Sequence, residues 1–146
     1  AIIAAVLLNA GTITGGIFLG YLVDRVGPFK VLPFSYLAAA LFTVLTGYMS
    51  DDLVPVAILA FCAGFCVGGG QIVANGMAAL FYPVEIRSTG VGWAFGFGRV
   101  GAIIGPVVGG ILISMGLSTP AIFAAFAVPG IIAALAVFLL GRSRPD

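Results

Sequence analysis

The stretch GVGWAFGFGRVGAIIGP, residues 90–106, places a single arginine, Arg99, inside an otherwise apolar run. A helix through this run carries Arg99 about 15 Å beyond Thr89, which is half of a hydrocarbon core about 30 Å thick. A charged side chain at that depth usually faces protein or a water-filled cavity. The stretch therefore predicts a membrane helix with one face turned towards a polar interior.

The rest of the chain has the same character. It has 146 residues, of which 62% are hydrophobic and 8% charged, whereas soluble domains carry about 25% charged residues. The net charge of +1 gives no reason to expect a nucleic-acid partner. Five apolar segments are long enough to span a membrane: residues 1–22, 30–49, 54–81, 88–115 and 119–141. We therefore predict an all-α polytopic membrane protein, with residues 1–146 forming a single membrane domain in contact with lipid.

Basic residues occur in alternate connections between these segments. The first and third connections and the tail contain Arg25, Lys30, Arg87, Arg142 and Arg144, and the second and fourth connections contain none. The positive-inside rule then makes the first and third connections and the C-terminus cytoplasmic. The chain would begin on the outside with an alanine, so we expect an N-terminal part to precede it.

Polar groups on other segments are predicted to lie at the level of Arg99. Gln71 lies fourteen residues before Glu85 and Arg99 lies fourteen residues after it, so an antiparallel helix pair brings them to similar depth. Asn75 is one turn from Gln71 on the same face. In the first segment Thr12 lies about 16 Å from the cytoplasmic side, and Asn9 lies one turn further out.

The segment 88–115 has two distinct faces at about 100° per residue. Phe95 shares the face of Arg99. A separate stripe of small residues, which would let helix backbones approach closely, consists of Ala94, Gly98, Gly101, Gly105 and Gly109.

Several function classes find no support in these residues. Cys62 and Cys66 could be a metal-binding pair, but two thiols in a chain without histidine make a poor metal site. No catalytic constellation lies at membrane depth, so we expect neither an enzyme nor a cofactor. An oligomeric channel or scaffold subunit, complete with five helices, remains an alternative.

Two stretches resemble motifs of the major facilitator superfamily. GYLVDRVGPFK, residues 20–30, resembles its loop signature G-x-L-x-D-R-x-G, although Pro28 and Phe29 replace basic residues of the usual pattern. YPVEIRSTGVGWAFGFGRVGAIIGPVVGG, residues 82–110, resembles the start of helix eleven and is most similar to the aromatic acid:proton symporter family. The matching residues in that stretch are Tyr82, Pro83, Arg87, Thr89, Gly90, Gly92, Trp93, Gly98, Arg99, Gly101, Ile103, Gly105 and Pro106.

This resemblance implies a fold and a function. The five segments would be helices eight to twelve, which form part of the C-terminal six-helix bundle of a twelve-helix transporter in the inner (plasma) membrane. The missing N-terminal half would complete a central cavity. Alternating access would carry an aromatic carboxylate, a small organic anion, together with protons. Sugar and organic-ion porters share P-x-E-x-R-S-T-G at this place, so such a porter is the alternative.

The resemblance and the chemistry together give a hypothesis for the site. The guanidinium of Arg99 would bind the substrate carboxylate. The pocket would be lined by Gln71, Asn75, Asn9, Thr12 and the aromatic Phe95. The alternative is that Arg99 only pairs with an acid in the other half. No acidic residue lies inside a predicted span, so the proton carrier would belong to the missing part.

Charged residues at the cytoplasmic helix ends suggest a gate. Asp24, Arg25 and Arg87 would lie there, with Asp24 near a helix N-terminus or paired to Arg87, and the contact would break when the cytoplasmic side opens. The simpler alternative is that they are solvated charges that set the orientation of the chain.

Overall fold

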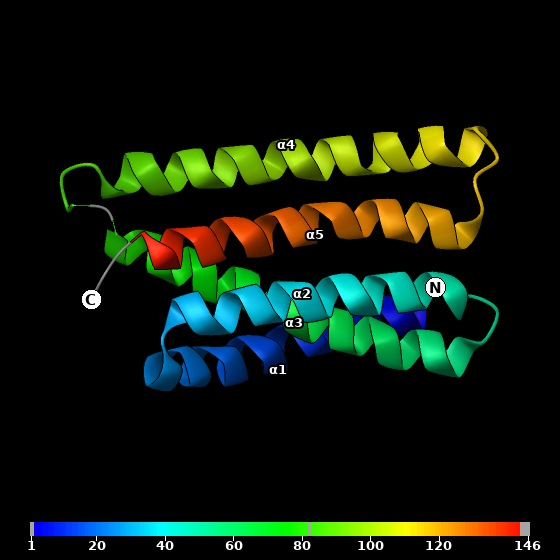
Figure 1. Cartoon of the computed structure of the whole chain (residues 1–146), viewed down its shortest axis with the longest axis horizontal. Coiled ribbons are helices and arrows are strands. Elements are labelled where there is room, and N and C mark those ends of the chain that lie inside the picture. The colour runs from blue at the N-terminus through cyan, green and yellow to red at the C-terminus, as the bar shows by residue number, and fades with distance from the viewer. Residues whose placement is uncertain (1, 82, 144–146) are drawn as a thin grey trace.

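The computed structural model, which describes residues 2–81 and 83–143, contains five long helices lying side by side (Figure 1). They are α1 (Ile2–Val26), α2 (Pro28–Tyr48), α3 (Leu53–Phe81), α4 (Arg87–Ser114) and α5 (Thr119–Arg142). All five are long and apolar enough to cross a membrane. The predicted all-helical fold with five membrane spans is confirmed. Tyr82 of the sequence motif and Arg144 of the basic tail lie outside the described residues.

The first connection is shorter than expected. Helix α1 ends at Val26 rather than near residue 22, so Asp24 and Arg25 lie in its last turn and not in a loop. Gly27, with a φ of 97°, makes the turn, and Pro28 opens α2. The length of an apolar segment in the sequence predicts only the part of a helix that crosses lipid, and not where the helix ends. The helix itself stops where glycine adopts a left-handed conformation and proline cannot donate a hydrogen bond.

Helices α1 and α3 pack closely along glycines. Gly11 and Gly15 of α1 lie against the backbone of Phe61 and Phe65 in α3. The contact is reciprocal, because Gly64 of α3 lies against the backbone of Leu8. A methyl group at any of these three glycines would collide with backbone atoms, so the absence of side chains permits the close approach.

A small apolar core lies near the end of the bundle where α1 finishes and α2 begins. Its buried members are Leu19, Val31, Leu32 and Val73, which come from α1, α2 and α3. Further along, the buried hydroxyl of Ser35 donates a hydrogen bond of 2.8 Å to the carbonyl oxygen of Cys66. This end of the bundle is thus held by both apolar packing and a polar contact between α2 and α3.

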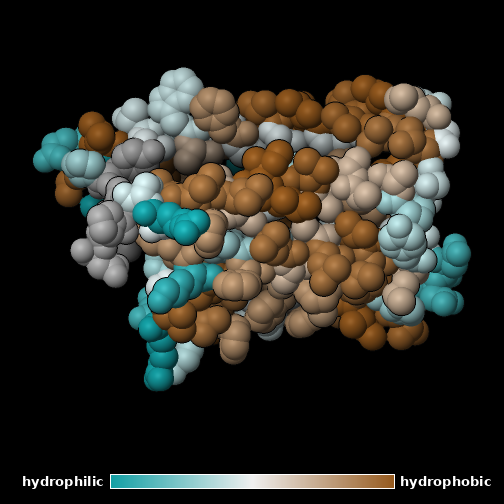
Figure 2. Space-filling view, viewed as in Figure 1, coloured by the Kyte–Doolittle hydropathy of each residue, from teal (hydrophilic) through white to brown (hydrophobic). Residues whose placement is uncertain are grey.

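Helix α4 lies at the edge of the bundle, beside α5 (Figure 1). Gly109 is its buried residue and lies against the ring of Phe126 in α5. Nearly all its other side chains are exposed or half-buried. Figure 2 shows apolar side chains over the middle of one face of the molecule and hydrophilic ones towards its two ends, as expected of a membrane-spanning bundle.

Candidate functional site

Arg99 lies near the middle of α4, twelve residues after Arg87 and fifteen before Ser114. These separations correspond to about 18 Å and about 22 Å along the helix. The side chain is exposed, and it forms no hydrogen bond or ion pair with any residue that the structure describes. The guanidinium therefore lies at mid-helix level and has no partner among residues 2–81 and 83–143.

The two faces of α4 have different surroundings. The side that meets α5 includes buried Gly109 of the stripe of small residues, which lies against the ring of Phe126. Arg99 is ten residues from Gly109, which places it roughly 80° around the helix at 3.6 residues per turn. Phe95, one turn before Arg99, is 49% exposed. Arg99 thus lies to one side of the packing contact with α5 and not within it.

The predicted residues of α3 lie at the expected height. Gln71 lies ten residues before Phe81, about 15 Å from the end of α3 that adjoins the start of α4. Its side chain is exposed, and that of Asn75, one turn closer to that end, is half-buried. Gln71 and Arg99 are thus at similar depth on consecutive antiparallel helices. Among the described residues, no hydrogen bond joins Arg99 to either amide.

The predicted residues of α1 lie beside α3. Asn9 is exposed, and its amide nitrogen donates to the carbonyl oxygen of Ala5 at 2.8 Å. Thr12 is half-buried at the contact between the helices. Its hydroxyl is within hydrogen-bonding distance of two carbonyl oxygens, at 3.0 Å from that of Leu8 and 3.3 Å from that of Gly64. The structure therefore places Thr12 in the helix interface, with its proton directed to backbone acceptors.

Part of α4 forms a shallow hollow that the sequence did not assign to the site. The hollow has a volume of about 300 Å³ and is lined by Ser88, Thr89, Gly92, Trp93 and Gly96. The ring of Trp93 lies 6.0 Å from that of Phe97, measured between centroids. The sequence signal for this hollow is the spacing of four residues between Trp93 and Phe97, which puts both rings on one helix face. A tryptophan near a helix end is equally typical of the aromatic belt at a membrane surface, so this spacing does not by itself indicate a site.

The predicted gating residues lie at one end of the bundle, where α1 ends and α4 begins (Figure 1). Asp24 is exposed and forms no ion pair with a described residue. The guanidinium of Arg25 lies over the ring of Tyr21, 4.8 Å from its centroid. Arg87 is half-buried as the first residue of α4. All three are therefore attached to helix ends, where a rigid-body movement of a helix would carry them along.

The two cysteines are free thiols within α3, with Cys62 half-buried and Cys66 buried. In the described ranges 2–81 and 83–143, no group of three or more histidine, cysteine, aspartate or glutamate side chains is placed to hold a metal ion.

Comparison with known proteins places this arrangement in a family. The profile of the Major Facilitator Superfamily matches residues 1–146. No solved structure matches the chain.

Similar curated proteins carry transporter names. The chain is 37% identical over 138 residues to a gallate transporter of Pseudomonas putida, which covers 94% of this chain and 31% of that protein. It is 34% identical over 133 residues to the 4-hydroxybenzoate transporter PcaK of Acinetobacter baylyi, and the alignment covers 91% of this chain and 29% of that protein. It is 37% identical over 137 residues to the benzoate transport protein of Acinetobacter baylyi, and the alignment covers 94% of this chain and 29% of that protein. The chain thus spans about a third of the length of these relatives.

The family match extends over the whole chain, and the relatives bear out the resemblance to aromatic acid transporters seen in the sequence motifs. The relatives are named as transporters and not as enzymes, in agreement with the expectation from the sequence. The five apolar helices agree with a partial bundle of this fold. The chain is a multi-pass membrane protein that belongs to the major facilitator superfamily.

Proposed function

We propose that the protein containing this chain carries aromatic carboxylates across the inner membrane together with protons, by alternating access. The observation that carries the proposal is Arg99, an exposed guanidinium at mid-helix level without a partner in the described chain. An arginine at the bilayer centre costs roughly 2.5 kcal/mol or more when it is not paired or hydrated. A water-filled cavity that admits an organic anion removes that cost.

The side chains around Arg99 suit an aromatic carboxylate. Arginine presents a planar fork of donors that matches the two oxygens of a carboxylate. Phe95 lies one helical turn away on the same side of α4 and offers an aromatic surface to the substrate ring. The names of the relatives, which include gallate, 4-hydroxybenzoate and benzoate transporters, support this class of substrate.

The remaining lining residues belong to α1 and α3. Gln71 and Asn75 would provide amide donors and acceptors at the depth of Arg99. On α1, Asn9 would provide its amide group, and Thr12 would provide only its hydroxyl oxygen as an acceptor, because its proton is directed to backbone carbonyl oxygens. The close glycine packing of α1 on α3 supports this, because it fixes the two helices relative to each other. The four residues would thus form one continuous polar wall.

We place this chain as helices eight to twelve, with a second six-helix half completing the cavity. The basic residues at alternate connections support a cytoplasmic C-terminus. The exposed face of α4 supports a partner outside this chain, because the described helices leave it uncovered. In the proposed cytoplasmic gate, Asp24, Arg25 and Arg87 would lie at the helix ends, and a contact that Asp24 forms with Arg87 in another state of the cycle would break when the cavity opens inwards.

The proton carrier of the proposed symport would lie outside the middle of these helices. The acidic residues of the chain are Asp24, Asp51, Asp52, Glu85 and Asp146, which all occupy helix ends, connections or the tail. An acid in the other half would then bind the proton.

Uptake by the whole protein tests the proposal. Cells lacking other aromatic-acid carriers would express the wild type, Arg99→Ala, Arg99→Lys or the control Val100→Ala, a change at an exposed neighbour. We expect Arg99→Ala to lower uptake of radiolabelled benzoate or 4-hydroxybenzoate at least about tenfold, because a hydrogen bond to a charged group contributes about 1.5–3 kcal/mol. Arg99→Lys keeps the charge without the fork and should retain part of the uptake.

Surface abundance, measured by immunoblot, separates binding from assembly. Normal abundance with lost uptake supports a binding role, and lost abundance of both variants supports the alternative in which Arg99 pairs with an acid of the other half. Full uptake by Arg99→Ala at normal abundance contradicts the assignment of Arg99. Wild-type uptake that is unaffected by collapse of the proton gradient contradicts the proposed symport.

A further inference from the structure

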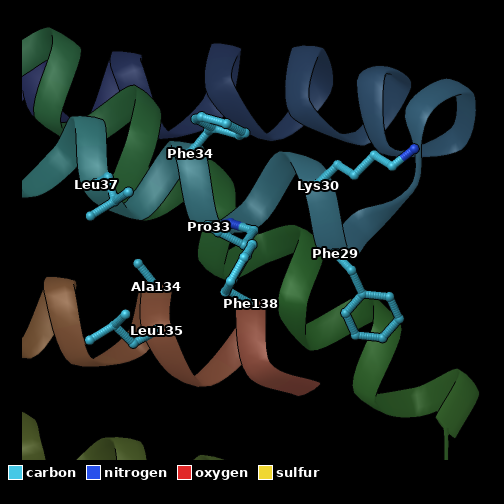
Figure 3. Close-up of a pocket in the computed structure, with 8 residues that line it drawn as sticks. All are labelled: Phe29, Lys30, Pro33, Phe34, Leu37, Ala134, Leu135 and Phe138. Atoms are coloured by element: carbon cyan, nitrogen blue, oxygen red, sulfur yellow. The ribbon is translucent and has the colours of Figure 1, made fainter. Parts of the chain in front are cut away.

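A groove of about 350 Å³ runs between α2 and α5, away from the proposed transport site (Figure 3). Its walls include Pro33, Phe34 and Leu37 of α2 and Ala134, Leu135 and Phe138 of α5. Both helices end or begin at the end of the bundle that contains the basic residues. The groove lies at this end and extends towards the middle of the helices.

The groove is apolar and open along one side. Phe34 is 76% exposed and Leu135 is 55% exposed, so both present hydrocarbon surface outwards rather than to the protein core. From Phe29 to Leu37 the groove follows α2 for eight residues, which corresponds to about 12 Å along the helix. This distance is close to the hydrocarbon depth of one leaflet, about 15 Å.

A glycine holds the two helices together at the mouth of the groove. Gly141 of α5 lies directly against the side chain of Phe29, which also lines the groove. A methyl group at Gly141 would come within 2.6 Å of the Phe29 β-carbon. Because this contact joins the start of α2 to the end of α5, it brings the neighbouring residues Lys30 and Arg142 to the same end of the groove.

Two cations therefore lie near this end of the groove. Lys30 lines the groove, and its side chain extends towards the turn between α1 and α2 rather than into the apolar space (Figure 3). The guanidinium of Arg142 lies over the ring of Phe138, 5.5 Å from its centroid. The lining residues include no acidic side chain, although Asp24 occupies the last turn of the neighbouring helix α1.

We infer that this groove binds an anionic phospholipid, with an acyl chain along the apolar walls and the phosphate group between Lys30 and Arg142. A hydrocarbon slot about as deep as one leaflet, with Lys30 in its lining and Arg142 over the ring of Phe138, matches the two parts of such a lipid. A soluble phosphate would leave the apolar walls uncovered, and an uncharged lipid would not use the cations. The proposed orientation of the chain places this lipid in the cytoplasmic leaflet, and its binding does not depend on the transported substrate.

Native mass spectrometry of the purified whole protein tests this site. The protein would be titrated with phosphatidylglycerol or with phosphatidylcholine of the same acyl chains. We expect the double variant Lys30→Gln/Arg142→Gln to weaken retention of phosphatidylglycerol at least threefold and to leave phosphatidylcholine unchanged. Leu135→Trp, which fills the groove, should weaken retention of both lipids.

Matched controls separate the groove from general attraction. Arg25→Gln removes a cation at the same end of the bundle, and Leu139→Trp enlarges a 61% exposed residue of α5 that does not line the groove. Neither should change lipid retention. Leu37→Trp fills the groove from α2 and replaces Leu135→Trp if that variant is not monodisperse on size exclusion.

Two results overturn the inference. One is equal loss of phosphatidylglycerol in Arg25→Gln and in the double variant, which would indicate attraction by surface charge alone. The other is wild-type retention of both lipids in the groove-filling variants. Because lipid retention is measured without substrate, failure here leaves the proposed transport intact, and failure of uptake leaves the lipid site intact.

Discussion

The hydroxyl of Thr12 on α1 lies 3.3 Å from the carbonyl oxygen of Gly64 on α3 and donates to it across the helix interface. The same hydroxyl lies 3.0 Å from the carbonyl oxygen of Leu8 in its own helix. Gly64 in turn lies against the backbone of Leu8. One small residue and one short hydroxyl therefore fix the distance between the two helices that bear Asn9 and Gln71.

Gly64→Ala should destabilise the protein because the added methyl group meets the backbone of Leu8, which cannot move aside without separating the helices. Overpacking typically costs about 1–3 kcal/mol. The matched control is Gly76→Ala in the same helix, where a methyl group meets nothing within 4 Å. Thermal unfolding of the detergent-purified protein measures both variants. Equal melting temperatures for the two would contradict the close packing of α1 on α3.

Thr12→Val should affect uptake less than Asn9→Ala or Gln71→Ala. The single hydroxyl proton of Thr12 is already directed to backbone carbonyl oxygens, so it is not available to a substrate carboxylate. Loss of such a hydrogen bond within a membrane costs about 0.6 kcal/mol on average. Initial uptake rates, corrected for surface abundance, rank the three variants. A larger loss in Thr12→Val than in the other two would show that this ranking is wrong.

Phe95→Leu should weaken the preference for aromatic over saturated carboxylates. Leucine keeps apolar bulk at this 49% exposed position but removes the aromatic face, and an aromatic pair contributes about 0.5–1.5 kcal/mol beyond area burial. We expect the ratio of inhibition constants of cyclohexanecarboxylate and benzoate to fall about 2- to 10-fold. Competition against labelled benzoate measures this ratio. Phe97→Leu, at an exposed residue of the same helix, should leave it unchanged.

Asp24→Asn should slow turnover more than it weakens substrate binding. Asp24 lies in the last turn of α1, far along the helix from Thr12, so its charge acts at the proposed gate and not on bound substrate. Transport rates in proteoliposomes and calorimetric binding constants separate the two effects. Asp51→Asn, at an exposed residue in the turn between α2 and α3, serves as the control. If Asp24→Asn turned over at the wild-type rate, Asp24 would have no role in the gate and would only help to set the orientation of the chain.

Only part of the candidate site could be predicted from the sequence. Helical rise gave Gln71 and Arg99 similar depths, and the structure places both at exposed positions of that height. The involvement of Thr12 in the interface was not predictable, because helical periodicity says which residues share a face but not which face meets a neighbour. Asp24 and Arg25 were expected in a loop for a related reason: hydropathy measures the lipid-crossing length, and the helix continues to Gly27.

The sequence alone determined that the chain has five helices long and apolar enough to cross a membrane, with one arginine near the middle of the fourth, because apolar length and the position of a charge can be read from the chain itself. The tertiary structure decided which glycines form contacts. Those of α1 and α3 pack backbone against backbone, whereas Gly92, Gly98 and Gly101 of α4 have nothing within reach of an added methyl group in the part of the chain that the structure describes. Glycines take these different roles because two helices approach closely only where both have small residues at the same height. The sequence of one helix does not specify which residues of a second helix lie opposite it.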